Sequence, residues 1–213
     1  QIGPGTVTAQ GAWQAGHWQG RMQLQQLQPG LVHSAFEGPS LSGPMLAEQM
    51  ASGRVQVKAD LRPDSGPVAA PATGRTTEDH LQLLGQWSAE RWPIERLSVR
   101  LAGAMLQANG SWAPARRLAE GELQMQIPGL QASAQGRLGP EEGEGQARLD
   151  STALQQAQTW LQRWPALAQG LPALPLSGDA QLRLAWQGGW SRSDSPLQAE
   201  LRRSEERRVG KEG

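Results

Sequence analysis

The 213-residue sequence contains no cysteine, no tyrosine and a single phenylalanine, Phe36. The absence of cysteine excludes disulfide bonds, thiol catalysis and cysteine-ligated metals, and it leaves the cellular compartment open. Basic and acidic residues each number 20, so no net charge is present to attract nucleic acid or an anionic membrane. No apolar run reaches the roughly 18 residues of a membrane-spanning helix, and no signal peptide is visible.

Catalytic motifs are missing as well. The sequence has no G-x-S-x-G nucleophile motif, no phosphate-binding P-loop and no GxGxxG loop. Three glutamates, Glu141, Glu142 and Glu144, cluster in GPEEGEG, where glycine and proline indicate a solvated hairpin tip rather than an acid–base pair. Three scattered histidines lack the spacing of metal ligands. They are His17, His33 and His80. We therefore expect no enzyme, no metal site and no cofactor.

What the sequence does contain is a series of segments in which apolar and polar residues alternate. Residues 94–149 hold the longest such series, and shorter ones occupy residues 5–25, 54–61, 80–87 and 179–187. A period of two places successive side chains on opposite faces of a β-strand. The sequence therefore predicts an all-β fold with one apolar face and one wet face, and a one-residue slip in register would exchange the two faces.

The chain divides into four parts on this pattern. Residues 1–61 and 80–202 are predicted β-strand repeats, and residues 62–79, rich in proline, glycine, threonine and alanine, are a predicted flexible loop or linker. Within residues 31–53 the pattern is less regular, and residues 45–50 fit either one helical turn or a short strand. The charged stretch at 203–213, RSEERRVGKEG, looks like a translated adapter sequence, with a disordered native tail as the alternative. The start at Gln1 suggests an internal piece of a longer protein.

Residues 151–164 change to helical spacing, with Trp160 and Trp164 expected to dock a short helix against the sheet. Asp150 or Ser151 is expected to cap its start. Pro165 is expected to end it.

The nine tryptophans have two interpretations, and five of them close a Gly-x-Trp motif. Exposed rings could stack on sugars, whereas rings at the end of an apolar strand face usually pack. The apolar register contains four of them and so favours packing. They are Trp13, Trp18, Trp112 and Trp186.

The alternating strands, the Gly-x-Trp motifs and two longer stretches together resemble a known family. The stretches are MQLQQLQPGLV at residues 22–32 and WPALAQGLPALPLSGDAQLRLAWQGGW at residues 164–190. Over residues 1–202 the chain resembles TamB-type proteins of the bacterial translocation and assembly module, within the AsmA-like group. The resemblance implies an elongated antiparallel β-sheet curled into an open groove, or a β-solenoid-like taco, lined by apolar side chains. Roughly ten strands at about 4.8 Å spacing would make it some 45 Å long.

The resemblance also implies a function. Such proteins are anchored in the inner membrane, cross the periplasm and partner a BamA-type outer-membrane barrel through parts outside this sequence. They are implicated in outer-membrane protein assembly and in moving phospholipid, whose acyl chains the groove would shelter. The residues expected to line the groove are Leu97, Val99, Leu101, Leu106, Leu123, Met125, Ile127, Leu182, Leu184 and Trp186. The alternatives are an extracellular carbohydrate-binding or adhesive β-solenoid and a structural spacer with a closed core.

Overall fold

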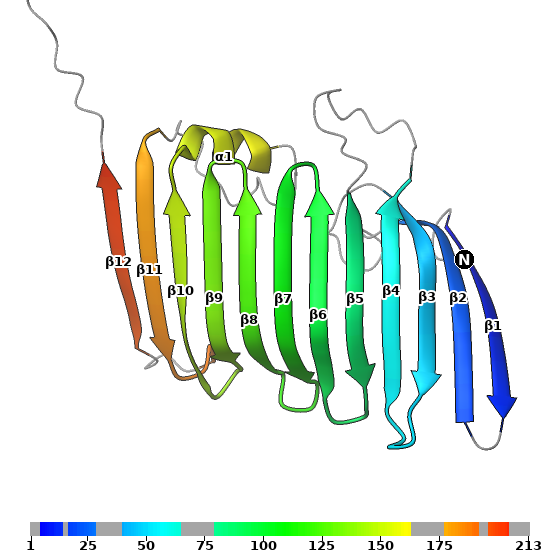
Figure 1. Cartoon of the computed structure of the whole chain (residues 1–213). Helices are drawn as coiled ribbons and strands as arrows, with labels where there is room; N and C mark the ends of the chain where they lie inside the picture. Colours follow the sequence, from blue (N-terminus) through cyan, green and yellow to red (C-terminus); the bar gives the residue numbers. More distant parts are fainter. Residues whose placement is uncertain are drawn as a thin grey trace, which may run out of the picture.

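A computed structural model describes residues 5–14, 17–28, 40–64, 79–162, 177–191 and 196–204. These residues form twelve β-strands and one helix, and the strands follow one another along the chain (Figure 1). The strands are β1 (Thr6–Gln14), β2 (His17–Leu27), β3 (Leu41–Gln49), β4 (Val55–Pro63), β5 (His80–Trp87), β6 (Trp92–Leu101), β7 (Ala104–Ala113), β8 (Leu118–Ile127), β9 (Leu130–Leu138), β10 (Gly143–Ser151), β11 (Asp179–Gln187) and β12 (Leu197–Ser204).

All twelve strands belong to one sheet, in which each strand pairs antiparallel with the next strand along the chain. The order β1 to β12 contains no crossover, and the sheet is not closed into a barrel. This is the elongated, open, antiparallel all-β architecture that the sequence predicts. Eleven spacings of about 4.8 Å give the sheet a width of roughly 53 Å.

The predicted boundaries need three changes. Residues 45–49 belong to strand β3, so the helical-turn alternative is wrong. Strand β4 continues to Pro63 and pairs with β5, so the sheet is continuous across the predicted linker, of which residues 65–78 lie outside the described residues. Strand β12 includes Arg203 and Ser204, whereas residues 205–213 of the predicted tail are not described.

The register keeps apolar side chains in rows that cross the whole sheet. Directly opposed residues lie on the same face of an antiparallel sheet, so a row of partners shares one face. One such row takes one residue from every strand. Its members are Ala9, Met22, Met45, Ala59, Leu83, Leu97, Ala108, Leu123, Ala134, Ala147, Leu184 and Ala199. We call the face that carries this row the apolar face, and the opposite side the polar face.

Two β-bulges preserve this separation. The pairing of β2 with β3 shifts between Leu24 and Leu27, and the pairing of β6 with β7 shifts between Ile94 and Leu97. Each interval is three residues, which in a regular strand would put its two ends on opposite faces. The extra residue of the bulge returns the second side chain to the apolar face. At the first bulge Gln26 takes a positive φ of 52°.

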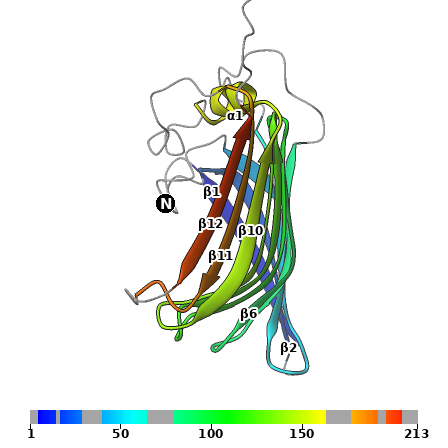
Figure 2. The same cartoon turned by 90° about the vertical axis from the view of Figure 1, so that its left-hand side faces the viewer.

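Helix α1 (Leu154–Leu161) packs on the apolar face at one end of the strands. Ala157 and Trp160 bury Ile127 of β8, and the Trp160 Nε1 donates a hydrogen bond to the Ala102 carbonyl oxygen at 2.9 Å. The docking role predicted for Trp160 is therefore confirmed, and Trp164 lies outside the described residues. In Figure 2 the strands are bowed and α1 sits inside the bow, so the apolar face is the concave one.

The predicted caps of this helix are wrong. Ala153 occupies the N-cap position and no side chain caps the helix. The Ser151 hydroxyl instead donates to the Gly129 carbonyl oxygen at 2.8 Å, and the Asp150 carboxylate accepts hydrogen bonds from Arg148. Strand β10 continues through both residues, so their side chains are already committed to the sheet when the helix begins.

A row of glycines runs beside the apolar row. Gly110, Gly121, Gly136 and Gly145 are successive partners on β7 to β10. The first three have φ values of 152°, 155° and 142°, which L side chains rarely adopt. A Cβ atom on any of the four would collide with the backbone of the neighbouring strand. Glycine is therefore required here by the close approach of the strands.

Replacing Gly121 with alanine should destabilise the sheet by more than about 1 kcal/mol, because the φ value and the contact with the Asn109 carbonyl are both incompatible with a Cβ. Gly11→Ala is the matched control, since its Cβ would have no neighbour nearer than 3.6 Å. Urea unfolding of both variants gives the measurement. Equal stability of the two variants would contradict this explanation of the glycine row.

Trp160→Ala should undock α1 and cost about 3–5 kcal/mol in the stability of that end of the sheet. Trp160→Phe keeps most of the ring contact and loses only the hydrogen bond to Ala102, so its cost should be near 1 kcal/mol. Amide hydrogen exchange of α1 and of the Ile127 region reports both effects. Unchanged protection in the alanine variant would show that Trp160 does not anchor the helix.

Candidate functional site

The structure brings all ten predicted lining residues to the apolar face. They come from strands β6, β7, β8 and β11. Val99, Leu106 and Met125 are direct partners on three successive strands, and Leu97 and Leu123 flank Ala108 in the next row. Leu101 pairs with Ala104, and Leu182, Leu184 and Trp186 alternate along β11.

Strands β9 and β10 join the two groups with small side chains. Met125 continues through Ala132 and Leu149 to Leu182. The neighbouring row passes from Leu123 through two alanines to Leu184. The apolar face thus combines large side chains on β8 and β11 with alanine, glycine and a few leucines, such as Leu149, on β9 and β10.

Ile127 differs from the other nine residues because α1 covers it. Its side chain is 3% exposed, whereas Leu123 on the same strand is 38% exposed. Met125 lies between these extremes and packs against the edge of the α1 cluster. Ile127 therefore belongs to the end that α1 closes and Met125 to its margin, whereas the other eight residues are half-buried or, at Leu123, exposed.

Further residues of this face were not predicted as lining residues. Leu61 and Leu81 extend the row of Val99 toward β4, and Leu149 and Leu201 extend it toward β12. The alternation of residues 54–61 and 80–87 already carried the signal for the first two. Leu149 could not be placed beside Leu182 from sequence, because the helix and a long connection separate their strands.

The tryptophans of the strands also lie on the apolar face. Trp13 pairs with Trp18, and Trp92 pairs with Trp112. The four tryptophans predicted in the apolar register do lie on this face. Trp87 joins them, with its ring centroid 5.1 Å from that of Trp92.

Two of these rings cover glycine backbone, and in neither case is that glycine the one of a Gly-x-Trp motif. The Trp18 ring lies over Gly20 of its own strand, and the Trp186 ring lies over Gly145 of the neighbouring strand. The Trp186 Nε1 reaches on to β9, where it donates to the Arg137 carbonyl oxygen at 3.1 Å. The Trp186 indole therefore covers Gly145, the last glycine of the row, on β10.

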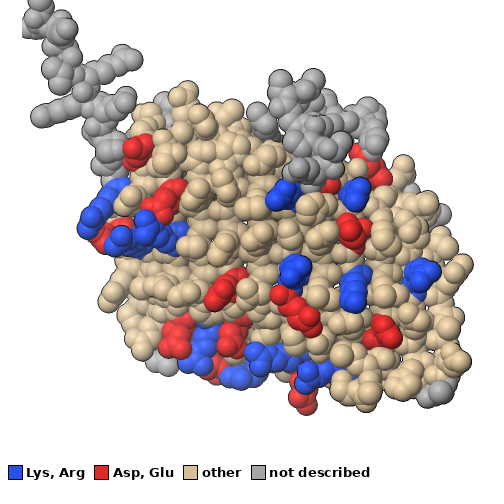
Figure 3. Space-filling model, in the orientation of Figure 1, with Lys and Arg blue, Asp and Glu red and all other residues tan. Residues whose placement is uncertain are grey.

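The polar face carries charges of both signs, interspersed over its surface (Figure 3). Arg91 pairs with Glu120 at 3.1 Å and Arg137 pairs with Glu144 at 3.3 Å, all with exposed side chains. Exposed pairs of this kind contribute between zero and about 1 kcal/mol each. They keep this side of a single-layered sheet soluble rather than holding the fold together.

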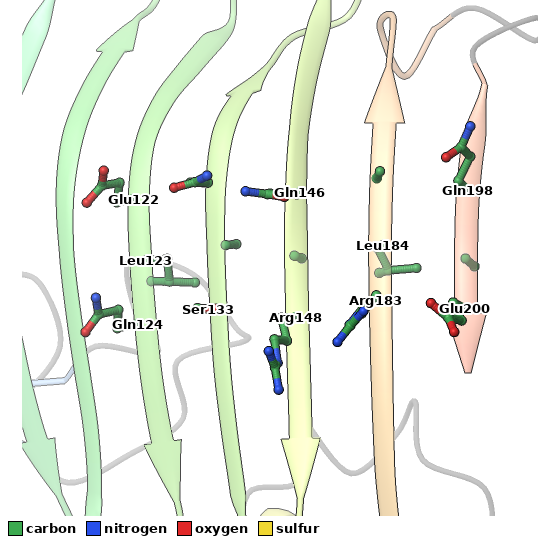
Figure 4. Close-up of a pocket in the computed structure, with 15 residues that line it drawn as sticks. Glu122, Leu123, Gln124, Ser133, Gln146, Arg148, Arg183, Leu184, Gln198 and Glu200 are labelled. Carbon is green, nitrogen blue, oxygen red and sulfur yellow. The ribbon is translucent and has the colours of Figure 1, made fainter. Parts of the chain in front are cut away.

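Three hollows of 610, 1020 and 460 Å³ lie on this polar face. The first is bounded by rows of long side chains, including Gln124, Arg148 and Glu200 (Figure 4). Long amide and charged side chains stand up from the sheet and leave spaces between the rows. The hollows offer hydrogen bonds and charge, so they do not suit an acyl chain.

Arg148 and Arg183 are direct partners within the first hollow. Arg148 donates to both Asp150 carboxylate oxygens, at 2.5 and 3.0 Å. This hydrogen bonding holds the pKa of Asp150 below its ordinary value, with a smaller effect from the charge of Arg183. Arg148 and Arg183 lie opposite each other on neighbouring strands, and the negative charge of Asp150 offsets the repulsion between them.

Among the described residues, no group of three or more His, Asp or Glu side chains is arranged to hold a metal. Glu142 pairs with Arg116, and Glu144 with Arg137, at the β9–β10 hairpin. His33 lies outside the described residues. In the same ranges, no helical segment combines the length and apolarity that a membrane crossing requires.

Comparisons with protein families, with curated proteins and with solved structures find no match to this chain.

Replacing Arg148 with glutamine should raise the pKa of Asp150 toward its ordinary value, because the bidentate hydrogen bond is lost. A depressed folded-state pKa stabilises the protein above the unfolded-state pKa, and this contribution disappears as the pH falls through the folded-state pKa. The stability difference between the wild type and R148Q should therefore exist at neutral pH and vanish in acid. Carboxyl NMR titration measures the shift.

Arg183→Gln is the control for this titration, with a smaller expected rise in the pKa of Asp150 because Arg183 acts only through its charge. A larger rise in this control than in R148Q would contradict the assignment.

Proposed function

We propose that the chain is a segment of an apolar groove that shelters lipid acyl chains. The observation that carries the proposal is a row of apolar side chains that crosses all twelve strands on the concave face. Among the described residues, α1 covers this face around Ile127, and Leu24, Ala47 and Leu61 are buried on β2 to β4, while large side chains such as Trp13, Trp87 and Leu123 stay exposed. A sheet with one apolar face normally buries that face against a second layer. A lipid chain can take the place of that layer without specific polar contacts.

The exposure of single side chains supports an unfilled face. No large side chain among the described residues is fully buried, and Leu123 on β8 is 38% exposed. Each CH₂ group transferred from water to such a surface contributes about 0.8 kcal/mol, so one acyl chain supplies several kcal/mol of binding energy.

The two alternatives fit these observations less well. A closed spacer requires an opposite wall, and the described residues form one layer. A sugar-binding surface combines aromatic rings with hydrogen-bonding side chains. Here the rings of β5 to β7 lie on the apolar face, and the charged and amide side chains lie mostly on the other face.

The cellular setting of this proposal rests on the resemblance to TamB-type proteins alone. In that setting the protein lies in the periplasm, is anchored in the inner membrane through parts outside this sequence, and partners a BamA-type barrel. Its groove would pass phospholipid between the membranes and support outer-membrane protein assembly.

Val99→Asp combined with Met125→Asp should abolish lipid capture, because two carboxylates would stand in the middle of the apolar row. The measurement is lipid extraction and native mass spectrometry of residues 1–202 purified from a bacterial periplasm. Wild-type protein should carry phospholipid at a defined stoichiometry, and the double variant should carry none while its far-UV β signal persists. Lipid retained by the folded double variant would refute the proposed face.

Ser98→Asp combined with Gln124→Asp is the matched control. These residues adjoin Val99 and Met125 on the same strands and face the polar side. The control should keep its lipid. Because Met125 touches the α1 cluster, Leu123→Asp provides a second test at an exposed position away from the helix. Folded wild-type protein without lipid would favour the spacer alternative.

A further inference from the structure

Tryptophans are concentrated at one end of the strands. Seven of the nine lie at that end or one row inside it: Trp13, Trp18, Trp87, Trp92, Trp112, Trp186 and Trp190. Trp190 belongs to the β11–β12 connection, where its backbone N–H donates to the Gly139 carbonyl of the β9–β10 turn. The strands β1, β2 and β5 to β7 thus share one aromatic end. We call these seven residues the tryptophan rim.

The rings of the tryptophan rim combine apolar surface with exposure to water and with polar contacts. The side chains of Trp13, Trp87 and Trp190 are 71%, 57% and 55% exposed. The Trp92 Nε1 donates to the Ser88 carbonyl oxygen at 3.0 Å, so its polar edge already finds a partner in the turn. Indole rings favour such places, where an apolar environment meets a polar one.

Ion pairs stand beside the rim. Arg91, between Trp87 and Trp92, pairs with Glu120 and donates to the Ser111 hydroxyl at 2.8 Å. Arg116 of the β7–β8 turn pairs with Glu142 of the β9–β10 connection. The Arg91–Glu120 pair faces the polar side of the sheet, away from the rings. The rim itself is exposed to water, so a charged lipid headgroup at this end would keep its hydration, at no cost of burying its charge.

At its other end the apolar face is closed by α1 over strands β7 to β9. Ile127, Ala157 and Trp160 are 3%, 2% and 8% exposed, and Leu130 and Leu161 pack against them. A headgroup placed there would have to displace this cluster and lose its water. From the row of Trp112 to the row of Leu106 the strand spans six residues, or about 20 Å, lined by apolar side chains.

We infer that a bound phospholipid lies along the strands, with its headgroup at the tryptophan rim and its acyl chains pointing toward α1. This inference rests on the proposed function, because it gives the orientation of the ligand on the same apolar face. The rim places the indole rings at the depth of the ester groups. The rows of Val99 and Leu97 then contact the acyl chains.

Two single-cysteine variants test the orientation. The chain has no cysteine, so each introduced thiol is a unique labelling site. Leu138→Cys lies in the row of Trp112 at the rim, and Leu101→Cys lies at the opposite end of the same face. Each is labelled with a small fluorophore and mixed with phosphatidylcholine that carries a nitroxide quencher either on its headgroup or next to the terminal methyl of one acyl chain. Far-UV spectra check that each labelled variant is folded.

The headgroup nitroxide should quench the Leu138 site several-fold more strongly than the Leu101 site, and the terminal nitroxide should reverse this order. Equal quenching at the two sites, or the opposite order, would overturn the orientation while leaving lipid binding intact. No quenching by either lipid at either site would instead refute the proposed function itself.

A rim variant separates the role of the rings from that of apolar area. Trp87→Leu, Trp92→Leu and Trp112→Leu together keep an apolar side chain at each position and remove the indole N–H groups. Lipid should still bind, and the preference of the headgroup nitroxide for the Leu138 site should fall toward parity. An unchanged preference would show that the rings do not set the orientation.

Discussion

The whole structure depends on a period of two that is kept in register across eleven strand pairings. Slipping any one pairing by a single residue would turn every apolar side chain of that strand to the polar side. Fully burying one leucine or methionine is worth roughly 1.5–3 kcal/mol, so several misplaced side chains per strand would be costly once the face is covered. The bulges at Gln26 and before Leu97 show how strictly the period is kept, since each restores the apolar face after an irregular interval.

A single layer changes what holds the protein together. The strands are joined by their backbone ladders and by neighbouring side chains. Among the described residues a small apolar cluster lies beneath α1, and a few further apolar side chains, such as Leu24 and Leu61, are buried elsewhere in the sheet. The glycine row also depends on backbone contacts, because Gly110 and Gly121 let two strands approach where any Cβ would collide. Exposed ion pairs on the polar side add little stability. Covering the apolar face would therefore add more stability than any further contact on the polar side.

Much of the sheet could be predicted from sequence, because alternation is a local signal that needs no knowledge of neighbouring strands. Strand β3 was harder, since Gly43 and Pro44 interrupt the pattern that residues 45–49 resume. The caps of α1 failed for a tertiary reason: Ser151 is used by Gly129, a contact that joins residues far apart in sequence. Likewise, the alternation along β8 predicts Ile127 as one more lining residue, and its cover by Trp160 depends on a contact with a helix distant in sequence.

The two ends of the apolar face differ in a way that a simple spacer does not require. A filled core would favour similar apolar side chains throughout, as at Ile127 and Leu130. Instead, the end that contains Trp13 and Trp87 exposes large rings to water. Indole rings favour places where an apolar phase meets water. Under the proposed function an amphipathic ligand would supply that boundary over the described single-layered sheet, with its polar group facing the tryptophans.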